Sequence, residues 1–231
     1  MLNILKPDRK REIRGVLFDL DGVVIDTEKL YTRFWMEASR ELGHPMTFAQ
    51  ALQMRSLGSR ESQEKLDSFF GAAVLPYADL RARRIELMEA FIAEHGVEEK
   101  RGIRELLAHL KEKNIPRAIT SSSSIPVIRR HLGNLGLLDG FTALCSGKDV
   151  PMGKPAPDIY LHGAAQLGVK PEECIALEDS KNGLLSAHRA GCKPVMVPDL
   201  WQPDEEILQV ICGTYSDLEQ VKEALERGEI K

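Results

Sequence analysis

The sequence predicts an α/β protein, with a doubly wound parallel sheet and an all-helical insertion that follows the first strand. Beyond residue 97, short apolar runs alternate with helical stretches, which is typical of a parallel sheet with right-handed crossovers. One apolar run comes much earlier, at residues 15–18, and only helical patterns separate it from the next. We therefore expect a core domain formed by residues 13–26 and 97–231, and an inserted helical domain formed by residues 27–96. Residues 1–12 are expected to be an N-terminal extension.

Composition excludes several classes of protein. With 43% hydrophobic and 29% charged residues, the 231-residue chain is too apolar to be disordered and long enough to bury a core without disulfides. A net charge of −4 gives no electrostatic reason to bind nucleic acid. The sequence contains neither a membrane-spanning apolar run nor a secretion signal, and its four cysteines are scattered. We expect a cytoplasmic monomer with reduced thiols and no membrane or nucleic-acid partner.

The first strand and the insertion are assigned from local patterns. Residues 15–18 form a buried strand that ends in the turn sequence Asp-Leu-Asp-Gly. Thr27 is placed to cap a helix over residues 28–42, and Gly43 ends that helix. Two further helices are predicted over residues 59–70 and 77–94.

The rest of the chain supplies the remaining strands and helices. Strands are predicted over residues 117–120, 142–145, 174–177 and, as the last strand, 194–197. Helices are predicted over residues 103–113, 125–135, 159–167 and 180–190. Asp158 and Ser180 are suited to cap the last two helices, and Asp204 marks a further helix start. One serine of the run 121–124 is expected to cap the helix at residue 125.

Polar residues follow the predicted strands where each strand ends. The carboxyl ends of parallel strands share one edge of the sheet, where open α/β sheets bind ligands, and we expect the helical insertion to sit over that edge. Carboxylates gathered there repel one another, and a single lysine offsets only one of them. Oxygen ligands of this kind favour Mg²⁺, which together with a lysine and a hydroxyl can hold a phosphoryl group. The residues concerned are Asp19, Asp21, Ser121, Lys154, Glu178 and Asp179.

A carboxylate is the predicted nucleophile, because no Ser–His–Asp triad and no reactive cysteine is evident. Asp19 and Asp21 are two residues apart, so both point to the same side of an extended backbone. One of them can attack phosphorus while the other handles the proton of the leaving oxygen.

Taken together, these residues resemble the motifs of the haloacid dehalogenase superfamily. Its first motif is similar to Phe-Asp-Leu-Asp-Gly-Val at 18–23, and its second to Ser121 after an apolar strand. The third resembles Gly-Lys-Pro-Ala-Pro-Asp at 153–158, and the fourth Leu-Glu-Asp-Ser at 177–180. Their order and spacing match across nearly the whole chain. The insertion resembles the helical cap of the β-phosphoglucomutase-like subfamily, which implies a Rossmann-like core.

The resemblance implies a role for each motif residue. Asp19 would be the nucleophile that becomes an aspartyl-phosphate, and Asp21 the general acid and base. Mg²⁺ would be bound by Asp19, by the backbone carbonyl of Asp21, by Asp179, and by Glu178 directly or through water. The phosphoryl oxygens would be held by Ser121 and Lys154.

Each residue also has an ordinary structural interpretation. Lys154 could be a solvated loop lysine, and the acidic pair at 178–179 could simply favour a helix N-terminus. Arg60 lies near where related caps place a basic residue that contacts the substrate, but a surface arginine is equally compatible with its position. Phe34 and Trp35 are expected to belong to the core of the insertion rather than to a substrate platform.

The function predicted from these features is Mg²⁺-dependent hydrolysis of a small phosphorylated metabolite, a sugar or polyol phosphate. A phosphosugar mutase is the first alternative, although two mutase features are missing. No Lys-Asn pair follows Ser121, and Tyr31 stands where the mutases carry a histidine. The second alternative is a catalytically silent binding or regulatory protein, which the intact motifs argue against. Dehalogenation is disfavoured, since it does not need the acidic pair at 178–179.

Overall fold

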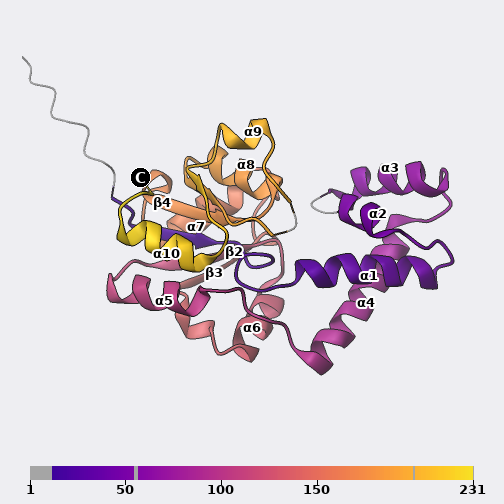
Figure 1. Cartoon of the computed structure of the whole chain (residues 1–231), viewed down its shortest axis with the longest axis horizontal. Helices are drawn as coiled ribbons and strands as arrows, with labels where there is room; N and C mark the ends of the chain where they lie inside the picture. Colours follow the sequence, from indigo (N-terminus) through magenta and orange to yellow (C-terminus); the bar gives the residue numbers. More distant parts are fainter. Residues whose placement is uncertain (1–11, 55–56, 200, 231) are drawn as a thin grey trace, which may run out of the picture. The chain divides into compact units, whose positions relative to one another are not determined.

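The computed structural model describes residues 12–54, 57–199 and 201–230 (Figure 1). The chain folds into two compact units. The first takes the residues up to Val24 and from Lys100 onwards, and the second is Ile25–Glu99. Within the second unit its two ends run side by side, because the Asp26 N–H donates to the Glu98 carbonyl over 2.8 Å.

A six-stranded parallel sheet forms the first unit, which confirms the α/β prediction. The strand order is β3-β2-β1-β4-β5-β6, so the first strand of the sequence lies in the middle and all of its residues are buried. The edge strand β6 is additional to the predicted strands and has only two residues. The strands are β1 (Gly15–Phe18), β2 (Arg117–Ser121), β3 (Ala143–Ser146), β4 (Cys174–Glu178), β5 (Lys193–Met196) and β6 (Gly213–Thr214).

Helices of the first unit connect the strands and cover the sheet. The helix α7 contacts β1, β2 and β3 at close range, since a Cβ placed on its Gly163 would lie 2.7 Å from the Thr120 methyl carbon. The helices are α5 (Ile103–Glu112), α6 (Ile125–Asn134), α7 (Asp158–Leu167), α8 (Lys181–Arg189), α9 (Glu205–Leu208) and α10 (Leu218–Glu226). The short 3-10 turns are η1 (Leu138–Gly140) and η2 (Pro171–Glu173).

In the described residues of the second unit the regular elements are helices joined by loops, apart from one isolated bridge between Ile25 and Glu99. Phe34 and Trp35 are buried in its apolar clusters, as expected of core residues. The helix α2 has only six residues and was not predicted from the sequence, although the capping box between Thr47 and Gln50 is a signature of a helix start. The helices are α1 (Glu28–Glu41), α2 (Phe48–Gln53), α3 (Ser59–Phe70) and α4 (Tyr77–His95).

Helix caps show where local prediction holds and where it fails. Ser180 and Asp204 accept backbone N–H bonds at the starts of α8 and α9, as predicted. Thr27 precedes α1 without a side-chain cap bond, and Ser124 does the same before α6. Asp158 is the first residue of α7 rather than its cap. None of the helices in the described part of the chain has the length and apolar character needed to span a bilayer.

Candidate active site

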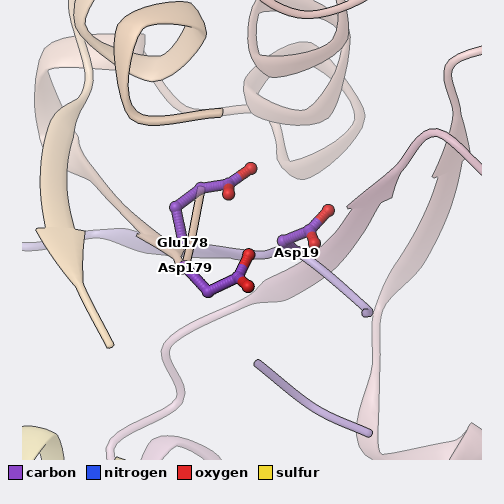
Figure 2. A group of neighbouring side chains, drawn as sticks. All are labelled: Asp19, Glu178 and Asp179. Carbon is purple, nitrogen blue, oxygen red and sulfur yellow. The ribbon is translucent and has the colours of Figure 1, made fainter. Parts of the chain in front are cut away.

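Three carboxylates from adjacent strands meet at the carboxyl edge of the sheet. β1 and β4 pair so that Phe18 lies opposite Leu177, and the Asp19 N–H donates to the Leu177 carbonyl over 3.0 Å. The register therefore places Asp19 beside the residues that end β4. Figure 2 shows Asp19, Glu178 and Asp179 at these strand ends, and one carboxylate oxygen from each lies within 4.8 Å of the others. All three residues are buried.

The ammonium group of Lys154 lies among these carboxylates. It donates to Asp19 Oδ1 over 2.6 Å, to Glu178 Oε1 over 2.5 Å and to the Thr120 carbonyl over 3.0 Å. These bonds use all three of its N–H donors. The Lys154 side chain is only 10% exposed, so the structure does not support the interpretation of a solvated loop lysine.

The pKa of both central groups is raised, Asp19 by burial and Lys154 by its acidic neighbours. Burial raises the pKa of Asp19 to about 8, and Glu178 and Asp21 add to that effect while Lys154 counteracts it. Burial opposes the charge of Lys154, but the carboxylates of Asp19 and Glu178 outweigh it and raise the Lys154 pKa. A strongly perturbed carboxyl group at a sheet edge is typical of a functional site.

The last residue of β2 and the loop that follows it bring two serines to the same edge. The Ser121 hydroxyl accepts the Ser123 N–H over 3.1 Å, which leaves its own proton available for a ligand oxygen. The Ser123 hydroxyl lies 3.4 Å from Asp21 Oδ2, to which it donates. The Ser123 carbonyl in turn accepts from the Ser146 hydroxyl over 2.8 Å. Ser123 is a site residue that sequence reasoning missed, although it belongs to the serine run 121–124.

The residues present fit a divalent cation. All donors are hard carboxylate or hydroxyl oxygens, which suit Mg²⁺ better than softer ions. When all four groups are ionised, the three carboxylates of Asp19, Glu178 and Asp179 and the ammonium group of Lys154 leave a net charge of −2, which a divalent cation would balance. A cation there would also lower the raised pKa of Asp19.

Arg60 belongs to the second unit, in α3. Its side chain is exposed and donates from Nε to Glu64 over 2.9 Å, one helical turn away. This is an ordinary surface pair, and a substrate role for Arg60 remains a prediction.

Comparison with known proteins identifies the family. The family described as haloacid dehalogenase-like hydrolase matches residues 13–191. Hexitol phosphatase B of Escherichia coli (strain K12) is 34% identical over 194 residues, which cover 81% of this chain and 85% of that protein. β-Phosphoglucomutase of Bacillus subtilis (strain 168) is 32% identical over 188 residues, covering 78% and 80% respectively. The crystal structure of CbbY from Rhodobacter sphaeroides with phosphate has a TM-score of 0.71 at 28% identity, covering 90% and 96%.

The chain therefore belongs to the haloacid dehalogenase-like hydrolases, as the sequence motifs indicated. The structures and sequences to which it is similar include both named phosphatases and a named mutase.

Replacement of Lys154 by methionine should destabilise the fold in a pH-dependent way. The variant leaves Asp19 and Glu178 buried without their common cation, which costs about 3–5 kcal/mol when both are charged. Because the folded pKa of Asp19 is raised above its ordinary value, the folded state binds protons more readily than the unfolded state. The cost is therefore largest above the folded pKa and shrinks as the pH falls from 9 towards 5.

Urea denaturation in EDTA at several pH values measures this effect. Lys111→Met, at an exposed position of α5, is the control and should change the free energy of unfolding by less than about 0.5 kcal/mol. An equal loss for Lys154→Met at pH 5 and pH 9 would contradict the electrostatic role of Lys154.

Proposed function

We propose that this protein is a Mg²⁺-dependent phosphatase that hydrolyses a small phosphomonoester through an aspartyl-phosphate on Asp19. The observation that carries the proposal is the Asp19 carboxylate, held 2.6 Å from Lys154 at the centre of a buried acidic cluster. A buried carboxylate beside a cation is suited to attack phosphorus, because its orientation is fixed before the substrate arrives.

The chain's own residues account for both halves of the reaction. An Asp19 oxygen forms a bond to phosphorus while the bond from phosphorus to the ester oxygen breaks, and Asp21 gives its proton to that leaving oxygen. Asp21 then removes a proton from a water molecule, whose oxygen displaces the Asp19 carboxylate and releases inorganic phosphate. The Ser123 hydroxyl, which donates to Asp21, would help to hold that side chain in place.

Ligand contacts follow from the same geometry. Lys154 and Ser121 would bind the phosphoryl oxygens, Ser121 through its hydroxyl hydrogen and Lys154 by exchanging one of its three present hydrogen bonds for a phosphoryl oxygen. Asp19, the Asp21 carbonyl, Glu178 and Asp179 would hold Mg²⁺, with Glu178 acting directly or through water. When bound, the metal ion supplies positive charge that offsets the charge of the transferring phosphoryl group.

The proposed substrate class is a sugar or polyol phosphate. Support comes from relatives named hexitol phosphatase and phosphorylated carbohydrates phosphatase, which are 34% and 30% identical to this chain. Arg60, from the helical unit, is kept as a proposed substrate contact. A screen of phosphorylated metabolites for phosphate release would identify the substrate itself.

Metal removal tests the acidic cluster. EDTA should abolish hydrolysis of p-nitrophenyl phosphate and Mg²⁺ should restore it, because the clustered carboxylates need a compact cation. Ca²⁺ should not restore it, since it prefers more ligands at longer distances and would misplace Asp19 relative to phosphorus. Full activity in a metal-free preparation would overturn the metal assignment.

The nucleophile is tested by Asp19→Asn, which keeps the shape of the side chain and removes its charge. Turnover should fall by about 10⁴-fold or more, with circular dichroism unchanged. Asp21→Asn should cost about 10²- to 10⁴-fold, because the leaving oxygen loses its proton donor. Asp139→Asn, an exposed carboxylate in η1, is the control and should leave turnover unchanged. Acyl phosphate trapped on any residue other than Asp19 would refute the mechanism.

A mutase is the second candidate, favoured by the 32% identity to β-phosphoglucomutase of Bacillus subtilis. A mutase must keep water away from the aspartyl-phosphate and bind a second phosphate. The absence of a Lys-Asn pair after Ser121, and Tyr31 in place of a histidine, favour hydrolysis. Tyrosine is neutral at pH 7 and a poor proton switch.

Incubation with β-glucose 1-phosphate, Mg²⁺ and a trace of glucose 1,6-bisphosphate separates the two activities. Phosphate release from several sugar phosphates, without isomerisation, is the expected result. Rapid formation of glucose 6-phosphate with almost no phosphate release would establish the mutase instead. A lack of turnover with every phosphomonoester would favour a binding or regulatory role.

A further inference from the structure

We propose that Tyr160 and Gly183 are positioning residues that hold the Glu178 carboxylate against Lys154 and so keep the Lys154 ammonium group on Asp19. This inference deepens the proposed function and rests on it. Neither residue touches Asp19 or belongs to the sequence motifs that define the site. They come from α7 and α8, the α-helices that precede and follow β4 in the chain.

Tyr160 contacts both members of the Lys154–Glu178 pair. Its hydroxyl donates to Glu178 Oε1 over 2.6 Å, and the Lys154 ammonium lies 5.2 Å from the centre of its ring. Tyr160 and Glu178 are both fully buried, so no solvent competes for this bond. Burying a phenol and a carboxylate costs free energy unless they are hydrogen-bonded, and this bond provides a partner for both.

Glu178 accepts hydrogen bonds on both carboxylate oxygens. Oε1 accepts from Lys154 and Tyr160, and Oε2 accepts from the Ser180 hydroxyl over 3.0 Å. The Ser180 hydroxyl also caps α8 by accepting the Gly183 N–H over 3.1 Å. The carboxylate is therefore held on one side by Tyr160 and on the other by the first turn of α8, which leaves it a single orientation toward Lys154.

Gly183 provides the space in which that carboxylate lies. A Cβ built on Gly183 would overlap the carboxyl carbon and both carboxylate oxygens of Glu178. The backbone of α8 thus approaches Glu178 more closely than any other residue type would permit. An alanine there would push the carboxylate away from Tyr160 and Lys154.

The position of Lys154 depends on this seat, which we define as Tyr160, Glu178 and Gly183. The Lys154 ammonium group is at the end of a flexible side chain, yet it lies 2.6 Å from an oxygen of the proposed nucleophile Asp19. Among the residues that the structure describes, Asp19 and Glu178 are the carboxylates that bind it, so a shift of Glu178 moves the ammonium group relative to Asp19. Small displacements of a group that acts on a transition state reduce turnover more than substrate binding.

Tyr160→Phe tests the seat with minimal change in packing. We expect kcat for p-nitrophenyl phosphate to fall about tenfold, while KM changes less than about threefold. Binding of orthovanadate, which copies five-coordinate phosphorus, should weaken by about the same factor in calorimetry with Mg²⁺ present. Tyr215→Phe removes a hydroxyl outside the seat, at the end of β6, and should leave kcat within about twofold.

A double-mutant cycle shows whether Tyr160 acts through Lys154. In a Lys154→Met background, Tyr160→Phe should weaken orthovanadate binding by less than about twofold, because the group it positions is gone. A merely structural role would give the same loss in both backgrounds and would overturn the proposal. A kcat for Tyr160→Phe within twofold of the parent would also overturn it.

Gly183→Ala reaches the same carboxylate from α8 and does not depend on Lys154→Met being folded. It should lower kcat at least tenfold, whereas Gly133→Ala, at a helical glycine of α6 with open space around it, should leave kcat within twofold. Equal kcat values for the two glycine variants would contradict the seat. If the parent protein does not hydrolyse any phosphomonoester, the proposed function fails, and the orthovanadate cycle still decides whether Tyr160 positions Lys154.

Discussion

The ammonium group of Lys154 lets several carboxylates occupy one buried edge of the sheet. Asp19 and Glu178 come from neighbouring strands and would repel each other strongly in a site this poorly solvated. Lys154 binds both and also the Thr120 carbonyl, so one side chain joins the ends of β1, β2 and β4. The arrangement of the site depends on that contact. The strands bring the carboxylates together, and the positive charge of Lys154 offsets the repulsion between them.

The parallel sheet determines which residues can take part. Since β1 is central and buried on every side, the chain that leaves it emerges at the middle of the carboxyl edge. β2 and β4 flank it directly, so the residues that end these strands, Ser121 and Glu178, lie at the same edge of the sheet as Asp19. Strand pairing therefore brings Asp19, Ser121 and Glu178 to one edge although they are far apart in the sequence, and the loop before α7 adds Lys154.

Much of this arrangement could be predicted from the sequence, and the reason is the strand pattern. Short apolar runs followed by Asp, Ser or Glu-Asp indicate strands that end in reactive or ligand-binding residues. In a parallel sheet these strand ends all lie at the carboxyl edge. The helices over residues 59–70 and 77–94 were predicted almost to the residue, because their boundaries carry Gly and Pro. The helix α10 was missed although its buried Leu218, Val221 and Ala224 recur at helical spacing.

The contacts of Tyr160 could not be predicted, because they depend on how α7 is rotated against the sheet. Tyr160 lies in an apolar stretch where a core tyrosine is the ordinary expectation, and its partner Glu178 is 18 residues away. Hydrogen bonds between residues on different elements leave no periodic pattern in the sequence from which they could be predicted.

The brevity of β6 affects how the molecule behaves when crowded. An edge strand exposes a row of unpaired backbone donors and acceptors onto which a strand of another molecule can add. With two residues, β6 offers too short a row for such an addition to be cooperative. One side of this sheet therefore ends without a template for edge-to-edge association, which protects a wholly parallel core against aggregation by strand addition there.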